Sequence, residues 1–215
     1  MPFVTVTLNG RSIFEETNFF KEFIYALIYS TPPGPVTRDQ QTSWDIIPFA
    51  DDEMWHNNDS AKSAYWGDAM QILADLWPNY STGQHAREWL AEVKPDISNF
   101  IKSVAGSGEK LPFNTLPLDY FAPGPGFFYI RNHWGKDATL IALQLGYAIS
   151  PPSHQHWDCG TFQIWRDGAW LSRESVGYED DLPGFGGHGT VQNEYMPAHN
   201  GLMFHGYSPD RKSVV

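Results

Sequence analysis

The stretch TFQIWRDGAWLS (residues 161–172) decides the fold of the second half of the chain. Its Arg166-Asp167-Gly168 step predicts a tight turn that joins the two flanking runs into an antiparallel β-hairpin. Two earlier runs, FFYIRNHW (127–134) and TLIALQLGYAI (139–149), have the same aromatic and β-branched character. Turn residues separate all of these runs. The pattern therefore predicts an antiparallel sheet in this part of the chain.

The first hundred residues follow the helical period instead. Between Ser12 and Tyr29 the apolar residues fall on one helix face: Phe19, Phe20, Phe23, Ile24, Leu27 and Ile28. A second helix is predicted from Ser60 to Trp77, where Pro78 follows. A third is predicted to begin near Thr82, a plausible N-cap, and to break at Pro95 before a last helical segment at 97–104. Helices followed by strands indicate an α+β fold rather than an alternating parallel sheet.

The segment 36–59 is polar with scattered aromatic residues, so we expect a long loop there. The change of texture after AGSGEKLPFN places a boundary between the helical and the β part near residues 105–117. We find neither an internal repeat nor a low-complexity tract. The chain is therefore expected to hold two segments, 1–110 and 111–215.

Composition and charge exclude several function classes. The chain has 215 residues, 41% of them hydrophobic and 15% aromatic, which is compatible with a sizeable packed core. The formal net charge is −11, and no Lys/Arg run offers a basic patch, so nucleic acid and anionic membrane surfaces are not expected partners. The single cysteine, Cys159, allows no internal disulfide, and no apolar run is long enough to span a membrane.

Two imidazoles lie close together in SHQHWDCGTF (153–162). On a strand their side chains point to opposite faces, so one of His154 and His156 would join a given site unless the segment bulges. A carboxylate and another imidazole follow at Glu174 and His199. Two histidines and a carboxylate that leave one position open form a typical set of ligands for zinc. His-x-His alone is a weak signal, because histidines on strands more often serve packing or the surface.

Three stretches resemble the heparinase II/III-like family of polysaccharide lyases: RNHWGKDATLIALQLG (131–146), SHQHWDCGTFQIWRDGAWLSRESVGY (153–178) and AHNGLMFHG (198–206). Together they cover about a third of the chain. The resemblance implies that 1–110 is the end of an α/α toroid and that 111–215 begins an antiparallel β-sandwich. It also implies that the chain is a fragment of a larger protein.

The resemblance further implies β-elimination on an acidic, uronic-acid-containing polysaccharide. It assigns His154 as the active-site histidine and His156, Glu174 and His199 as ligands of a zinc ion. The family usually has Asp where this chain has Glu174, which is one methylene longer. Family members act outside the cell, so a secreted or periplasmic location is expected, although no export signal is visible in this chain.

Two assignments stay open. The third zinc ligand could come from a different register, in which His188 or Gln192 takes the place of His199. Relatives also carry a tyrosine near the start of a toroid helix, whereas this chain has Phe19 and Phe20 at that spacing. A phenyl ring transfers no proton, so Tyr25 is the remaining candidate for a catalytic tyrosine, with simple packing as its alternative role.

Other functions fit parts of the pattern. A catalytically inactive relative could keep the zinc and bind carbohydrate without cleaving it. A cupin-like metal enzyme also uses His-x-His and a later histidine, but it needs a Glu three or four residues further on. Cys159 and Gly160 occupy that place here. The sequence does not distinguish alginate, heparan sulfate and hyaluronan as the substrate. The scarcity of basic residues disfavours a highly sulfated polymer.

Overall fold

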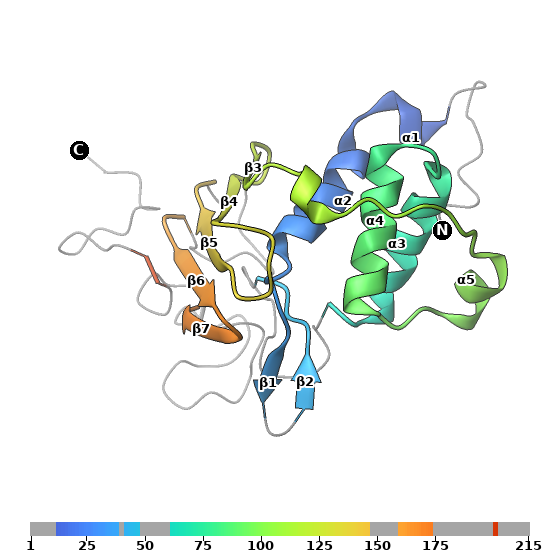
Figure 1. The fold of residues 1–215 in the computed structure, drawn as a ribbon. Coiled ribbons are helices and arrows are strands. Elements are labelled where there is room, and N and C mark those ends of the chain that lie inside the picture. Colours follow the sequence, from blue (N-terminus) through green and yellow to red (C-terminus); the bar gives the residue numbers. More distant parts are fainter. Residues whose placement is uncertain (1–11, 39–40, 48–60, 147–158, 174–199, 202–215) are drawn as a thin grey trace, which may run out of the picture. The chain divides into compact units, whose positions relative to one another are not determined.

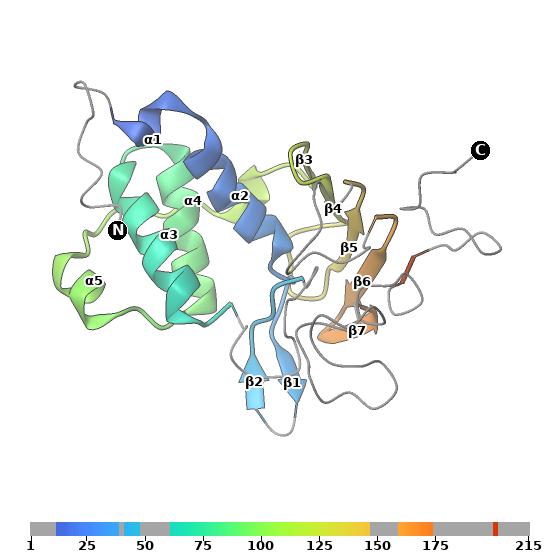
Figure 2. The same cartoon turned by 180° about the vertical axis from the view of Figure 1, so that it is seen from behind.

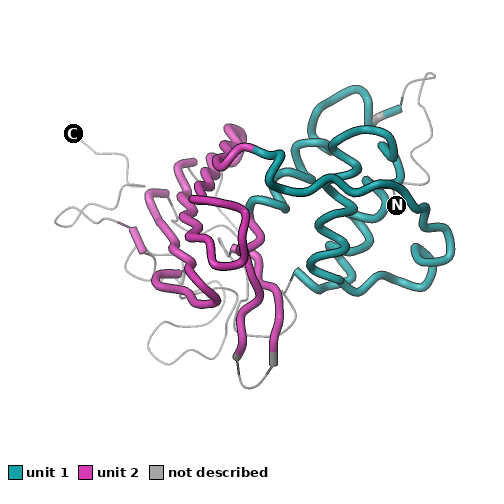
Figure 3. The backbone as a smooth tube through the Cα atoms, in the orientation of Figure 1, with its two compact units in different colours: residues 1–29, 61–116 teal, residues 30–60, 117–215 magenta. Residues whose placement is uncertain are grey.

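The computed structural model describes residues 12–38, 41–47, 61–146, 159–173 and 200–201 (Figure 1). The chain divides into two compact units, residues 1–29 with 61–116 and residues 30–60 with 117–215 (Figure 3). We call them the helical unit and the sheet unit and describe each by itself. None of the described helices is long and apolar enough to cross a bilayer.

The helical unit contains five described helices and one 3₁₀ turn: α1 Ile13–Glu16, α2 Phe19–Ser30, α3 Ala64–Leu76, α4 Ser81–Val93, α5 Asn99–Val104 and η3 Phe113–Thr115. The sequence predicted one helix from Ser12 to Tyr29, but the chain forms two. Thr17 between them is extended, and its hydroxyl accepts a hydrogen bond from the backbone N–H of Phe19. A threonine hydroxyl in this role favours a new helix start over continuation of the old helix.

Helices α3 and α4 lie side by side in both views (Figure 1, Figure 2). Position 83, in the first turn of α4, requires glycine, because a Cβ there would lie 2.1 Å from the carbonyl oxygen of Trp77. Met70 and Leu73 of α3 and Trp89 of α4 are almost completely buried. The helical core therefore forms from the apolar stripes that the period of the sequence predicted.

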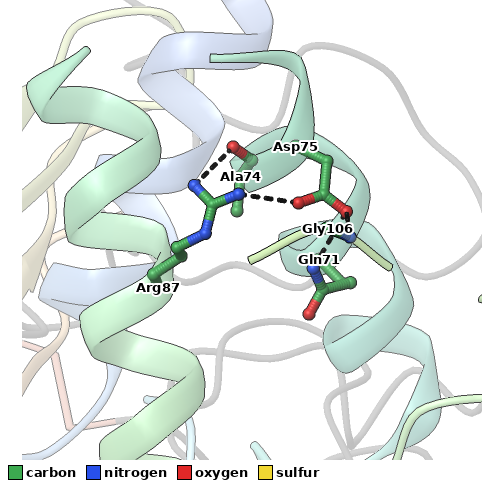
Figure 4. A network of polar contacts seen from close by, with 5 residues as sticks. All are labelled: Gln71, Ala74, Asp75, Arg87 and Gly106. Atoms are coloured by element: carbon green, nitrogen blue, oxygen red, sulfur yellow. Dashed lines mark hydrogen bonds and ion pairs between the residues drawn. The ribbon is translucent and has the colours of Figure 1, made fainter. Parts of the chain in front are cut away.

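A buried guanidinium also connects α3 to α4 (Figure 4). Arg87 donates to the carbonyl oxygen of Ala74 at 3.0 Å and to Oδ1 of Asp75 at 2.8 Å. The second oxygen of Asp75 accepts from Gln71 at 3.0 Å and from the backbone N–H of Gly106 at 2.9 Å. Hydrogen bonds to charged groups contribute about 1.5–3 kcal/mol each when partly buried. This network therefore holds the chain after α5 against the helix pair.

The sheet unit contains a two-stranded and a five-stranded antiparallel sheet. The strands are β1 Val36–Arg38, β2 Gln41–Ser43, β3 Asp119–Ala122, β4 Phe127–Arg131, β5 Thr139–Gln144, β6 Phe162–Arg166 and β7 Ala169–Ser172. The larger sheet is a meander in the order β3-β4-β5-β6-β7, with every neighbouring pair antiparallel. Helices followed by an antiparallel sheet confirm the predicted α+β fold class.

The turn between β6 and β7 has the predicted form. Asp167 and Gly168 both adopt positive φ, 49° and 79°, and these angles match the two central positions of a type I′ turn. Asp tolerates this conformation and Gly adopts it without steric cost, which explains why this dipeptide closes the hairpin.

Two short elements differ from the sequence prediction. The predicted loop 36–59 contains the hairpin β1–β2 in its described part, where the hydroxyls of Thr37 and Thr42 lie 3.1 Å apart. Strand β3 was not predicted. Strands of three or four residues are too short for an alternating pattern to emerge from the sequence, so their formation is decided by the partner strand.

Candidate functional site

Most of the predicted site residues lie outside the described part of the chain. This holds for His154, His156, Glu174 and His199, and also for the alternatives His188 and Gln192. Their roles therefore remain predictions. Among residues 12–38, 41–47, 61–146, 159–173 and 200–201 no group of three or more His, Cys, Asp or Glu side chains is placed to hold a metal ion. Tyr25 is the one predicted site residue that is described.

The side chain of Asn200 binds the β6–β7 hairpin, which lies far from it in the sequence. Its side-chain amide donates to the carbonyl oxygen of Phe162 at 3.3 Å and to that of Arg173. Asn200 directly follows His199 in the sequence, and Arg173 directly precedes Glu174. Asn200 and Arg173, each one residue away from a predicted zinc ligand in the sequence, are therefore in contact. Asn200 was not predicted as a site residue, and its place after a histidine was the available signal.

The same region of the sheet carries buried polar atoms. Gln144 ends β5 and Thr161 immediately precedes β6, with a hydrogen bond of 3.1 Å from the N–H of Gln144 to the carbonyl oxygen of Thr161. Among the described residues, Oε1 of Gln144 and Oγ1 of Thr161 have no hydrogen-bond partner, although both atoms are buried. An unsatisfied buried polar atom costs about 1–3 kcal/mol. Gln144 and Thr161 were not predicted as site residues; their polar type next to two adjacent strand segments was the available signal.

Tyr25 is half-buried on α2 in the helical unit. Its hydroxyl lies 3.2 Å from Oγ1 of Thr82 on α4, and its ring meets that of His85 edge-on at 6.0 Å between centroids. The phenol is thus held in place by a neighbouring hydroxyl. This arrangement suits a fixed proton carrier and equally suits a packed tyrosine, so the catalytic role of Tyr25 stays a prediction.

His85 is almost fully buried, with 3% of its surface exposed. Its Nε2 lies 2.9 Å from Oγ1 of Thr115, and that hydroxyl donates its own hydrogen to the carbonyl oxygen of Pro112 at 2.7 Å. Nε2 must therefore carry the proton and donate to Thr115. Nδ1 is then an unprotonated acceptor, and it has no partner among the described residues. Burial lowers the pKa of His85, in agreement with a neutral ring.

We expect the stability of the protein to fall in acid through His85. The histidine titrates near pH 6.5 in the unfolded chain and at a lower pH in the folded one, so the unfolded state binds more protons between these values. The contribution of His85 to the free energy of unfolding is therefore fully present above pH 6.5. Below that pH it decreases, by at most about 1.4 kcal/mol per pH unit for one group. Thermal unfolding at several pH values measures the slope.

The matched variants are His85→Gln and His133→Gln. Glutamine at 85 can still donate to Thr115 but does not titrate, so this variant should show a flatter pH dependence. His133 is 45% exposed, and its variant is the control for replacing a histidine outside the buried contact with Thr115. Equal slopes for the wild type and the His85 variant would refute this explanation.

Aromatic rings surround the first turn of α2. Phe20 packs on Phe14 at 4.5 Å between ring centroids, so the position expected for a tyrosine in relatives is apolar here. The side chains of Phe19 and Tyr65 are 64% and 78% exposed. Successive ring contacts of 5.2 to 6.5 Å connect these two ends, and we call the set the aromatic ladder: Phe20, Phe19, Phe23, Trp66 and Tyr65.

Comparison with known proteins relates the chain to polysaccharide lyases of the heparinase type, which confirms the predicted resemblance. The chain is 33% identical over 102 residues to a heparin-sulfate lyase of Bacteroides stercoris, a match that covers 45% of this chain and 13% of that protein. No protein-family model matches. The chain thus spans a small part of the length of this relative.

Two solved structures of such lyases match part of the chain. Heparan sulfate lyase HepC from Pedobacter heparinus matches with 20% identity and a TM-score of 0.46, over 75% of this chain and 20% of that one. Heparinase III matches with 17% identity and a TM-score of 0.49, over 75% of this chain and 22% of that one.

Proposed function

We propose that the chain acts in the eliminative cleavage of a uronic-acid-containing glycan. The observation that carries this proposal is the 33% identity to a heparin-sulfate lyase over 102 residues. A polymeric glycan of this kind lies outside the cell, so we also propose a secreted or periplasmic location. The related proteins are several times longer than this chain.

The chemistry defines what the residues have to do. In β-elimination a base removes the proton next to the sugar carboxylate, electrons shift to form a C4–C5 double bond, and the glycosidic C–O bond breaks. An acid protonates the leaving oxygen. The carboxylate must be neutralised so that the developing negative charge is stabilised. His154 suits proton transfer or charge neutralisation, because an imidazole titrates near neutral pH.

We propose that His156, Glu174 and His199 hold a zinc ion that orders the segment carrying His154. Two imidazoles and one carboxylate fit zinc in their chemistry. Asn200 supports this grouping, because it binds the carbonyl oxygen of the residue that precedes Glu174. When bound, the metal would fix the geometry of its ligands. The proton transfers are assigned to the side chains of the protein.

Tyr25 is the second proposed proton carrier. It is supported by its fixed hydroxyl, which lies within hydrogen-bond distance of Thr82. Phe19 and Phe20 cannot take this role, because phenyl rings carry no exchangeable proton. A tyrosine hydroxyl can serve as acid or base in an elimination.

An assay with a panel of uronic-acid polysaccharides tests the proposal. The chain is incubated with alginate, hyaluronan and heparan sulfate in the presence of zinc, and the ultraviolet absorbance of the unsaturated product is followed. We expect an increase with one member of the panel and none after heat denaturation. The similarity to a heparin-sulfate lyase favours heparan sulfate as the substrate, whereas the net charge of −11 disfavours a highly sulfated polymer. No increase with any polymer would contradict catalysis by this chain.

A second candidate function is glycan binding without cleavage. The aromatic ladder favours it, because the rings of Phe19 and Tyr65 are largely exposed. Exposed aromatic faces suit the apolar faces of sugar rings. Binding of a polysaccharide without formation of an unsaturated product would select this function over the lyase.

A further inference from the structure

The chain after α5 forms a strap, residues 106–115, that is attached to the helix pair α3–α4 by polar contacts. At its start the backbone N–H of Gly106 donates to Oδ2 of Asp75 on α3 at 2.9 Å (Figure 4). Further along, the N–H of Leu111 donates to the carbonyl oxygen of Gln84 on α4 at 3.2 Å. Most of the strap is exposed, so these contacts decide whether it stays on the helices.

His85 of α4 fastens the end of the strap. Its Nε2 donates to Oγ1 of Thr115 at 2.9 Å, and that hydroxyl donates to the carbonyl oxygen of Pro112 at 2.7 Å. The histidine is only 3% exposed, and its Nδ1 is a buried acceptor that has no partner among the described residues. The attachment of the strap therefore includes a neutral, buried imidazole.

Protonation of His85 would place a second N–H on Nδ1, where the described residues offer no acceptor. The groups that face the ring from neighbouring elements are the phenol of Tyr25 on α2 and the hydroxyl of Thr115. The carboxylate of Glu88, one turn further along α4, lies 4.0 Å from Nζ of Lys110 in the strap. A buried cation without a partner is costly. Water can solvate it if the end of the strap leaves the helix.

We propose that the strap is a pH-dependent switch, which leaves α4 when His85 is protonated while the helices stay formed. The strap leads to the point where the chain passes from the helical unit to the sheet unit, between Leu116 and Pro117, so its release frees this connection. This role is independent of the proposed glycan chemistry.

The direction of the pH dependence follows from burial, which lowers the pKa of His85 in the closed state. An exposed histidine titrates near pH 6.5 or so. Opening of the strap should therefore be independent of pH above about 6.5 and become more favourable below it, by at most about tenfold per pH unit. Below the pKa of the closed state the effect should level off.

Hydrogen exchange of the full chain, corrected for the intrinsic pH dependence of amide exchange, tests the switch. Protection of the amides of Gly106 and Leu111 should be constant above about pH 6.5 and fall by up to about tenfold per pH unit below it. Amides of α3 should keep their protection over the same range. Constant protection in the strap, or an equal loss in α3, would overturn the proposal.

The matched variants are His85→Gln and Glu88→Gln. Glutamine at 85 can still donate to Thr115 but does not titrate, so protection of the strap should no longer depend on pH. Glu88→Gln removes the carboxylate beside Lys110 and should keep the wild-type pH dependence. The opposite pattern in these two variants would overturn the role of His85.

Thr115→Val decides the question if the His85 variant fails to fold. Valine keeps the size of the side chain and removes the hydroxyl that accepts from His85. Protection of the strap should then be roughly 2- to 10-fold lower already at neutral pH, the usual contribution of one hydrogen bond. Wild-type protection in this variant would show that His85 does not hold the strap.

Discussion

Replacing His154 by alanine is expected to lower the rate of glycan elimination by about 10²- to 10⁴-fold, the usual contribution of a general acid or base. The proposed reaction needs one group to remove the proton next to the carboxylate and another to protonate the leaving oxygen. Alanine at 154 removes one of these groups without changing a proposed zinc ligand. The measurement is the initial rate of ultraviolet absorbance increase with the most active polysaccharide.

The control for this prediction is His133→Ala. His133 is also in the sheet unit, but it is 45% exposed, and its contacts are local: Nδ1 accepts from the N–H of Gly135 at 3.0 Å and Nε2 lies 3.9 Å from Oδ1 of Asp137. This variant should keep the wild-type rate. Zinc content should be equal in both variants. Full activity in the His154 variant would show that another residue transfers the proton. Loss of zinc from this variant would show that His154 is a zinc ligand.

Replacing His156 by alanine should weaken zinc binding by more than the 100-fold or so that the loss of an outer hydrogen-bond partner costs. A direct ligand supplies both a bond and part of the geometry, and two remaining ligands hold zinc poorly. Metal binding also stabilises the folded state, so the zinc-dependent part of the unfolding temperature should disappear. Chelator competition and thermal unfolding with and without zinc measure the two effects.

Glu174→Gln and His188→Ala refine this second prediction. The glutamine keeps size and polarity but removes the anionic oxygen, so it should weaken zinc binding as well. Replacing His188 by alanine should leave zinc affinity unchanged if His199 is the third ligand. Loss of zinc on replacing His188, with no change on replacing His199, would favour the alternative register. Unchanged affinity in the His156 variant would refute the ligand set.

The fold class could be predicted because it depends on period and turn chemistry. The helical stripe of α3 and α4 and the Asp167-Gly168 turn are local features, and both appear in the structure. The break at Thr17 and the strands β1 to β3 were missed. There the deciding interactions are a single side-chain hydrogen bond or a partner strand, which local pattern does not encode.

For the candidate site, the sequence could predict the types of residue and their chemical roles, but not which segments lie together in space. The residue types in SHQHWD and at Glu174 and His199 indicate proton transfer and metal binding, and they remain predictions outside the described residues. The pairing of Asn200 with Arg173 depends on which segments the sheet brings together, as does the pairing of Gln144 with Thr161. No spacing rule in the sequence contains that information.

Metal analysis of the purified full chain tests the central claim most directly. Elemental analysis after dialysis against zinc should find one zinc ion per chain, and the same treatment should leave the His156→Ala variant without metal. A wild-type chain that retains no zinc under these conditions would contradict the convergence of His156, Glu174 and His199 on one ion.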